Sequence, residues 1–122
     1  MILGIGCDII EISRIEKAIA RDFFLRRYFT DREIELIKSR GVNHAHVAAA
    51  NFCAKEAMVK AFGAGFGDIA PKDIEVLRDE RGAPYIVLHG TALWEFEKIK
   101  ATRISVSLSH SKGMALAFVV ME

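Results

Sequence analysis

The sequence predicts an α+β fold in which a mainly antiparallel sheet packs on a long central helix. The expected elements follow the order strand, helices, hairpin, helix, hairpin, which favours antiparallel strands over a parallel sheet. An alanine-rich stretch from Asn43 to about Phe62 suits one long helix, since alanine is the best helix former. Residues 103–109 alternate apolar and polar side chains, as half-buried strands do.

The N-terminal half begins with a strand and continues as helices. Residues 2–12 are apolar at both alternation positions, so we expect a strand that is covered on both faces. Ser13 is expected to cap a short helix, and Thr30 begins the capping-box pattern Thr-x-x-Glu of a second one. The helices are expected over residues 13–20 and 30–39, with Gly41 ending the second and Asn43 capping the long helix; no element is predicted for residues 22–30.

The C-terminal half contains strands and one helix after a glycine-rich loop. Gly63 and Gly65 end the long helix, because glycine commonly terminates helices. A turn-forming segment, Asp-Glu-Arg-Gly-Ala-Pro, separates two short apolar runs and predicts a hairpin. The expected elements are the loop 63–68, strands 73–78 and 85–88, an amphipathic helix 90–101 with Leu93, Trp94, Phe96 and Ile99, strands 103–109 and 114–121, and a turn between these two strands.

Length and composition predict one domain spanning residues 1–122, with about two-thirds of its surface buried. Apolar residues make up 52% and charged residues 27%, which excludes a disordered chain and favours some burial between subunits. The net charge of +1 excludes a strongly basic nucleic-acid binder. No apolar run reaches the ~20 residues of a membrane span. Two cysteines, expected as reduced thiols, and the lack of a signal-peptide pattern favour a cytoplasmic protein with no membrane partner.

Asp8 is a carboxylate in the middle of an apolar strand. A buried, ionised carboxylate costs several kcal/mol unless a cation compensates its charge. One interpretation is a salt bridge to an arginine or lysine. The other is a ligand for a hard divalent cation such as Mg²⁺, which takes one or two protein carboxylates and fills its other positions with water and phosphate.

The long helix carries Glu56 and Lys60 at i and i+4, the favoured order for an ion pair. An ordinary surface pair is one interpretation. Small or apolar residues surround these charges on nearly every side, however, so we expect the helix to be enclosed and its few charges to face a site or an interface. Spacing alone does not decide between the two.

Two further groups of residues have a functional and an ordinary interpretation. His110, among serines at a strand end, is a candidate general base, a phosphate donor or a solvated turn residue. Basic side chains around the first helix, with aromatic residues close by, form either a solvated mixed face or a docking face for an acidic partner. The basic residues are Arg14, Lys17, Arg21, Arg26 and Arg27.

Two segments together resemble a known family. Residues 4–15, GIGCDIIEISRI, are similar to the N-terminal signature of holo-acyl-carrier-protein synthases, and residues 52–61, FCAKEAMVKA, to the second signature of the 4′-phosphopantetheinyl transferase superfamily. The order and spacing of the two segments also fit, and the resemblance covers essentially the whole chain. Ala83 and Cys7 differ mildly from the residues that are common at these positions.

The resemblance implies a Mg²⁺-dependent transfer of the 4′-phosphopantetheine arm of coenzyme A to a serine of apo-acyl carrier protein, for fatty acid biosynthesis. Asp8 and Glu56 would hold the Mg²⁺, and Lys60 would contact the phosphates. The resemblance also implies a homotrimer with active sites between subunits. The remaining expected site residues are Gly63, Gly82, Pro84, Ser109 and His110 for coenzyme A, with His110 also among the catalytic residues, and Arg14 and Arg21 for docking the carrier protein.

The charged residues of the two segments suit the chemistry of this reaction. Attack of a serine hydroxyl on a pyrophosphate needs positioning and neutralisation of oxygen charge more than covalent help. Glu56, a metal-bound water, Asp31 acting through water and His110 are all candidates for the general base. The alternative functions are a non-catalytic trimeric coenzyme A-binding module and, less well supported, a small metal-dependent phosphohydrolase, which lacks the extra ligands of a two-metal site.

Overall fold

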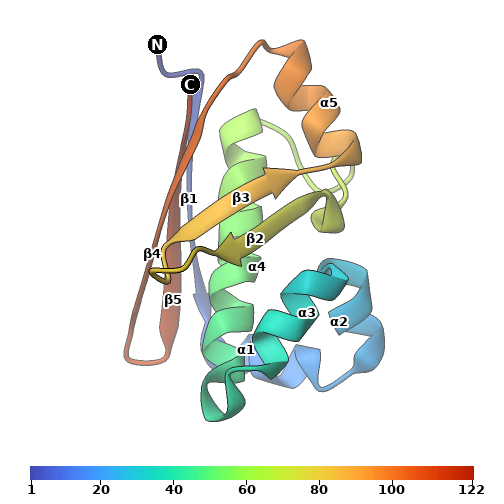
Figure 1. The fold of residues 1–122 in the computed structure, drawn as a ribbon, viewed down its shortest axis with the longest axis vertical. Helices are drawn as coiled ribbons and strands as arrows, with labels where there is room; N and C mark the ends of the chain where they lie inside the picture. The colour runs from blue at the N-terminus through green and yellow to red at the C-terminus, as the bar shows by residue number, and fades with distance from the viewer.

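The computed structural model describes residues 1–122 and is built around one long helix, α4 (Figure 1). A three-stranded sheet in the order β1-β5-β4 packs against α4, and a β2–β3 hairpin forms a second sheet. The strands are β1 (Gly4–Glu11), β2 (Ile74–Arg78), β3 (Pro84–Leu88), β4 (Ile104–Ser111) and β5 (Met114–Met121). All pairings are antiparallel, which confirms the predicted α+β class, although the strands form two sheets rather than one.

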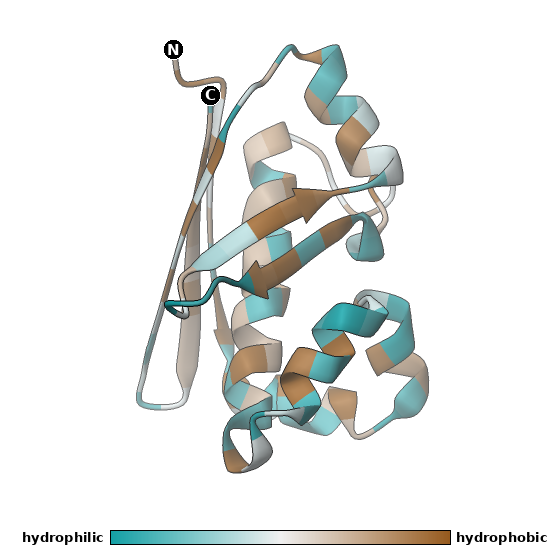
Figure 2. Ribbon diagram, in the orientation of Figure 1, coloured by the Kyte–Doolittle hydropathy of each residue, from teal (hydrophilic) through white to brown (hydrophobic).

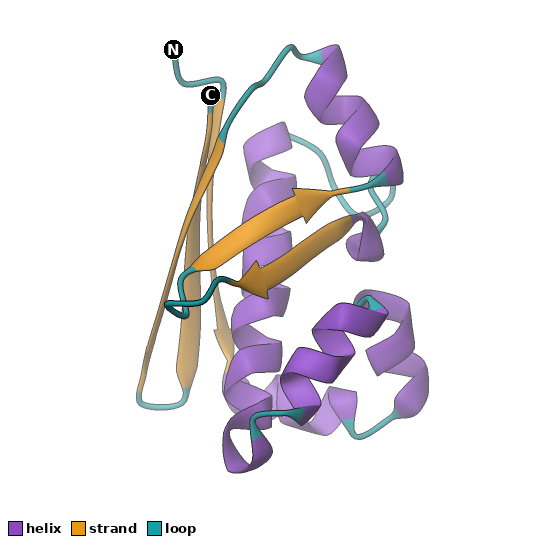
Figure 3. Cartoon of the chain, in the orientation of Figure 1, coloured by secondary structure: helices purple, strands orange, loops and turns teal.

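The helices other than α4 gather toward the two ends of the molecule (Figure 3). The helical elements are α1 (Ile12–Ile19), α2 (Asp22–Tyr28), α3 (Asp31–Lys38), η1 (Gly41–Asn43), α4 (His44–Phe62), η2 (Pro71–Asp73) and α5 (Gly90–Lys98). The first three gather around the N-terminal half of α4, and α5 lies near its C-terminal end. None of the helices combines the length and the apolar character that a membrane span requires.

Strand β1 approaches α4 closely because two of its residues are glycines. A Cβ atom on Gly6 would lie 1.7 Å from the backbone oxygen of Ala57, and one on Gly4 would lie 2.1 Å from that of Ala61. Only glycine fits such a contact, and the small side chains of Ala57 and Ala61 let the strand come close to the helix backbone. This contact places Asp8, two residues after Gly6 on the same face of β1, against α4.

The predicted capping box at Thr30 is confirmed. The Thr30 hydroxyl accepts a hydrogen bond from the Glu33 backbone N–H, and the Glu33 carboxylate accepts one from the Thr30 N–H. The expected Ser13 cap is wrong, because Glu11 occupies that position and makes no side-chain cap. Asn43 does precede α4, but its side chain caps nothing, because the chain enters α4 directly from the 3₁₀ turn η1.

Helix α2 forms where no element was predicted. Its aromatic residues Phe24 and Tyr28 stack with a ring-centroid distance of 4.4 Å, and Phe52 of α4 lies 6.0 Å from Phe24. Phe24 and Tyr28 meet because they are four residues apart on a helix. A contact with a distant helix therefore stabilises α2, which explains why its local sequence did not predict it.

Asp73 holds the start of α5. Its Oδ2 atom accepts hydrogen bonds from the Thr91 N–H, at 2.8 Å, and from the Thr91 hydroxyl, at 2.7 Å. Gly90 has a φ of +43°, and a Cβ atom there would lie 2.6 Å from the same oxygen. The helix ends at Lys98, three residues before the predicted end, and Trp94, expected on its apolar face, is 63% exposed.

The face of β1 and β5 that points away from α4 is largely apolar and uncovered. Ile5 and Ile9 of β1 are each 58% exposed, and Phe118 of β5 lies beside them on the same face. The prediction that this strand is covered on both faces is therefore wrong for a single chain. Figure 2 shows that apolar residues also make up much of β2 and β3, interrupted by hydrophilic ones, and the apolar residues Ile74, Val76, Ile86 and Leu88 belong to or pack against the core.

Candidate active site

Asp8 and Lys60 meet where β1 crosses α4. The Lys60 ammonium donates a hydrogen bond to Asp8 Oδ1 at 3.1 Å and another to the Cys7 carbonyl oxygen at 3.0 Å. The Asp8 side chain is 19% exposed and that of Lys60 is 53% exposed. The salt-bridge interpretation of Asp8 is thus realised, with a partner that is free to move because much of it is in solvent.

Cys53 is a contact of Asp8 that the sequence did not predict. It lies on α4, fully buried, and its thiol donates to Asp8 Oδ2 at 3.5 Å. Burial, followed by the negative charge of Asp8, raises the pKa of the Cys53 thiol to about 12, so the proton stays on sulfur. A signal was present in the sequence: Cys53 precedes Glu56 by three residues, which puts both on one side of the helix.

Glu56 has no hydrogen-bond or ion-pair partner. The ion pair with Lys60, one of the two interpretations of the i, i+4 spacing, does not form, because the ammonium contacts Asp8 instead. Burial raises the pKa of Glu56, the charge of Asp8 raises it further, and Lys60 offsets part of the effect. Two carboxylates therefore share one exposed ammonium, which leaves a local excess of negative charge.

The donor set of Asp8 and Glu56 fits a magnesium ion. Nowhere does the chain gather three or more His, Cys, Asp or Glu side chains that would enclose a metal. Magnesium does not need such a cage, because it binds one or two carboxylates and completes its octahedron with water and phosphate oxygens. The uncompensated charge at Glu56 is the observation that favours a cation here.

Lys55, next to Glu56, faces the core rather than a site or an interface. Its ammonium donates to Glu33 Oε1 at 2.8 Å, to the Pro71 carbonyl at 2.9 Å and to the Ile74 carbonyl. Burial lowers the pKa of Lys55 and raises that of Glu33, while each charge favours the other. This buried pair fixes α4 against α3 and β2, and so holds the helix that carries Glu56.

Four expected coenzyme A residues meet in one cavity of about 510 Å³. They are Gly82, Pro84, Ser109 and His110, and they come from the β2–β3 hairpin and from β4. His110 lies within β4, opposite Ala115, rather than in the turn where it was expected.

Basic side chains line this cavity, here called the cationic cavity. His46 of α4 stands edge-on to His110, with 5.8 Å between ring centroids, and Arg78 also lines the space. Burial and the nearby Arg40 lower the pKa of Arg78, whose guanidinium has no carboxylate partner. No acidic residue lines the cavity, so its chemistry suits a phosphate.

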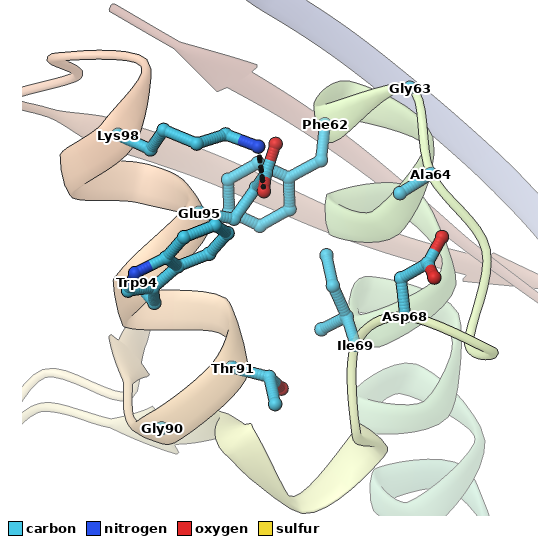
Figure 4. A pocket seen from close by; sticks show the side chains of 10 residues that line it. All are labelled: Phe62, Gly63, Ala64, Asp68, Ile69, Gly90, Thr91, Trp94, Glu95 and Lys98. Atoms are coloured by element: carbon cyan, nitrogen blue, oxygen red, sulfur yellow. Dashed lines mark ion pairs between the residues drawn. The ribbon is translucent and has the colours of Figure 1, made fainter.

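The cationic cavity and the carboxylate pair lie apart along α4. His46 precedes Glu56 by ten residues, which corresponds to roughly 15 Å along a helix axis. Gly63 lines another cavity, of about 940 Å³, beside α5 (Figure 4). Arg14 and Arg21 meet in a shallow hollow beside α1, together with Lys17. The structure therefore divides the expected residues into four groups.

The comparisons with known proteins agree on one family. A family model described as the 4′-phosphopantetheinyl transferase superfamily matches residues 4–119. A holo-[acyl-carrier-protein] synthase of Clostridium beijerinckii is 49% identical, over 100% of this chain and 98% of its own.

Solved structures give the same result. The Bacillus anthracis holo-(acyl-carrier-protein) synthase in complex with CoA (3′,5′-ADP) is 38% identical, with a TM-score of 0.82 over 99% of this chain and 96% of its own. The Helicobacter pylori holo-[acyl-carrier-protein] synthase in complex with coenzyme A is 31% identical, with a TM-score of 0.81 over 97% of this chain and 99% of its own.

Proposed function

Since the chain belongs to the 4′-phosphopantetheinyl transferase superfamily and is an enzyme of the holo-[acyl-carrier-protein] synthase type, we propose how its residues carry out this reaction. The 4′-phosphopantetheine group of coenzyme A is transferred to a serine of apo-acyl carrier protein, with Mg²⁺, in the cytoplasm and for fatty acid biosynthesis. The observation that carries the site assignment is that Asp8 of β1 pairs with Lys60 of α4, one helical turn from Glu56, whose pKa the charge of Asp8 raises.

The transfer forms one phosphorus–oxygen bond and breaks another. The serine oxygen forms a bond to the β-phosphorus, the bond from that phosphorus to the bridging oxygen breaks, and adenosine 3′,5′-bisphosphate leaves. The serine proton passes to a base. Negative charge grows on the bridging oxygen, so catalysis depends on neutralising oxygen charge in a fixed geometry.

Asp8 and Glu56 would hold the Mg²⁺, which supplies charge neutralisation to the diphosphate when bound. Lys60 would also bind the phosphate oxygens of coenzyme A. Its ammonium pairs with Asp8 in the structure, and it would turn to the phosphate oxygens when coenzyme A binds. Its 53% exposure and its hydrogen bond of 3.1 Å, longer than most charge-assisted ones, support this exchange.

The nucleotide end of coenzyme A would bind in the cationic cavity. Arg78, His46 and His110 offer donors to the 3′-phosphate, and no carboxylate opposes it. His46 of this cavity lies about 15 Å along α4 from Glu56 in one chain, and we propose that a neighbouring subunit supplies the cavity to each site. The uncovered apolar face of β1 and β5 supports a homotrimer, since such faces mark contacts between subunits.

Arg14 and Arg21 would dock the carrier protein. Both line the hollow beside α1 with Lys17, and only Glu11 among the lining residues is acidic. The same helix follows β1 directly, so a partner bound there would lie next to the strand that carries Asp8. A basic hollow of this kind suits an acidic partner and raises the rate of encounter.

The function is tested by incubating the protein with an apo-acyl carrier protein and coenzyme A, with Mg²⁺ or with a chelator, followed by mass spectrometry of the carrier. We expect the carrier to gain one phosphopantetheine group only where Mg²⁺ is present. A carrier that stays unmodified, while coenzyme A binds, would identify a binding module and contradict the proposed reaction.

A further inference from the structure

The buried thiol of Cys53 has no role in the reaction described above. Cys53 lies on α4, three residues before Glu56 and fully buried. Its sulfur is 3.5 Å from Asp8 Oδ2 and 3.5 Å from the Ala115 carbonyl oxygen. The carbonyl and the ionised carboxylate both accept hydrogen bonds, so two acceptors compete for the single thiol proton. Hydrogen bonds to a charged acceptor are the stronger kind, which favours donation to Asp8.

The two carboxylate oxygens of Asp8 therefore have different surroundings. Oδ2 faces the thiol in the core, whereas Oδ1 accepts a hydrogen bond at 3.1 Å from Lys60, whose side chain is 53% exposed. Asp8 lies opposite Ala117 of β5, and both Ala117 and Cys53 are completely buried, so the protein closes the Oδ2 side. A cation that arrives from solvent meets Oδ1 first.

The number of carboxylate oxygens that a site offers affects which divalent cation it prefers. Calcium takes about six to eight oxygen ligands and often binds both oxygens of one carboxylate, at about 2.3–2.6 Å. Magnesium is smaller, requires a near-octahedral arrangement at about 2.0–2.1 Å and keeps several waters. An aspartate with one oxygen held by a donor from the core therefore suits magnesium better than calcium.

We propose that Cys53 is a positioning residue for Asp8 and makes the cation site selective for magnesium over calcium, an inference that rests on the proposed function. By donating to Oδ2, the thiol fixes the carboxylate and leaves Oδ1 as the oxygen that a cation would bind. Glu56, on the next turn of the same side of α4, provides the second carboxylate. Without the thiol, the carboxylate of Asp8 can turn into the vacated space and offer both oxygens to one larger ion.

Two substitutions of nearly equal volume separate the hydrogen bond from the packing. Cys53→Ser keeps a donor at this position, whereas Cys53→Ala removes it, and both leave a similar small space in the core. Both variants are expected to fold, which circular dichroism checks. The wild-type protein and each variant are treated with a chelator, which dialysis then removes. Calorimetry measures coenzyme A binding to each protein without a divalent cation, with Mg²⁺ and with Ca²⁺.

The decisive quantity is the ratio of two effects, the tightening of coenzyme A binding by Mg²⁺ and its tightening by Ca²⁺. We expect Mg²⁺ to be the more effective ion for the wild-type protein. Cys53→Ala is expected to lower the ratio about tenfold, the lower end of what a hydrogen bond to a charged group contributes. Cys53→Ser is expected to keep a ratio close to that of wild type. A purely structural effect would weaken both responses equally and leave the ratio unchanged.

The outcomes separate this inference from the proposed function. An unchanged ratio in Cys53→Ala, an equal drop in Cys53→Ser, or a wild-type protein that responds alike to both ions would overturn the role of Cys53 and leave the proposed function standing. A wild-type protein that responds to neither ion would contradict the proposed metal site and this inference together. If the carrier protein is never modified in the transfer assay while the ratios behave as expected, the proposed reaction fails and the role of Cys53 stands.

Discussion

Asp8 carries a different donor on each of its carboxylate oxygens. The buried thiol of Cys53 contacts Oδ2, and the exposed ammonium of Lys60 contacts Oδ1. The thiol keeps its proton, since burial and the charge of Asp8 raise the pKa of Cys53 to about 12. The carboxylate is therefore anchored from the core and neutralised from the solvent side by a group that can leave.

Two adjacent residues of α4 have opposite environments. Lys55 is fully buried against Glu33, and Glu56 has no partner. The sequence predicted that both charges face a site or an interface, because it could not show that α3 supplies a buried carboxylate. Whether a charge in an apolar helix meets solvent or a buried partner depends on tertiary contacts, which local spacing does not determine.

Removing the buried ammonium tests this description of Lys55. Lys55→Met leaves Glu33 as an uncompensated buried carboxylate, so we expect the free energy of unfolding to fall by about 3–5 kcal/mol. Urea unfolding measures the loss. The control is Lys60→Met, the same substitution at an exposed position of the same helix, which is expected to cost less than about 1 kcal/mol. Equal losses in the two variants would show that the Lys55–Glu33 pair contributes no more to the free energy of unfolding than the exposed Lys60 does, which contradicts the prediction.

At the scale of elements, the contact between β1 and α4 determines where the site forms. Glycines on the strand and alanines on the helix allow the two backbones to approach, which brings Asp8 of β1 to Lys60 of α4. The two segments that resemble the family signatures form the two sides of this contact. The strand and the helix were predicted from the sequence, whereas their packing against each other is seen only in the structure.

A methyl group at Gly6 tests the close approach. Its Cβ atom would meet the Ala57 backbone oxygen at 1.7 Å, so Gly6→Ala must push β1 away from α4. We expect thermal or urea unfolding to show a loss of about 2–3 kcal/mol, typical of overpacking. Gly65→Ala, with nothing within 4 Å of the new atom, is the control and should stay within about 0.5 kcal/mol of wild type. A Gly6→Ala protein as stable as the control would refute the contact.

Glu75 joins α3 and β2 to the start of α5. Burial alone would raise the pKa of Glu75, but hydrogen bonds from Arg32, Thr30 and His89 outweigh it and lower the pKa to about 2. A carboxyl with a depressed pKa stabilises the fold above its ordinary value, near 4.5, and this contribution disappears as the pH falls towards 2.

The pH dependence of unfolding measures this contribution. We expect wild-type stability to fall between about pH 4.5 and pH 2. Glu75→Gln should lower stability by about 2 kcal/mol at neutral pH, through loss of charged hydrogen bonds, and should lose less on acidification. Parallel pH profiles for the two proteins would contradict the role of Glu75.

Features that depend on neighbouring residues could be predicted from the sequence, whereas elements that depend on contacts with distant segments could not. The capping box at Thr30 and the end of α4 at Gly63, where φ is +72°, follow from a few neighbouring residues. Helix α2 depends on stacking against Phe52, and so it was not predicted. Of the site residues, Asp8, Glu56 and Lys60 were found from sequence, whereas Cys53 and Arg78 gave no signal that was used.

For the whole molecule, the uncovered apolar face of β1 and β5 is the main feature that a single chain leaves unexplained. Ile5, Ile9 and Phe118 lie together on it, and every strand has its other face against the core. Period-two alternation predicted that β1 is covered on both sides. In the proposed trimer the neighbouring chains cover this face, so that prediction would hold for the assembly.

A charge placed on this face tests the proposed assembly. Phe118→Asp puts a carboxylate in the middle of the apolar face, and we expect light scattering to show a monomer, because burying an unpaired charge is too costly. Transfer activity should be lost with it, while circular dichroism retains the fold. Thr102→Asp adds the same charge at an exposed position before β4 and should leave the oligomer intact. A wild-type protein that is an active monomer would contradict the shared site.

The most direct test of the account is the effect of Mg²⁺ on coenzyme A binding, measured by calorimetry for wild type, Asp8→Asn and Glu56→Gln. We expect Mg²⁺ to tighten binding to wild type by at least about tenfold, and to have no such effect on either variant. Glu97→Gln makes the same change at an exposed position of α5, and Mg²⁺ should tighten its coenzyme A binding as it does for wild type. If Asp8→Asn and Glu56→Gln keep the full response to Mg²⁺, these two carboxylates do not hold the ion.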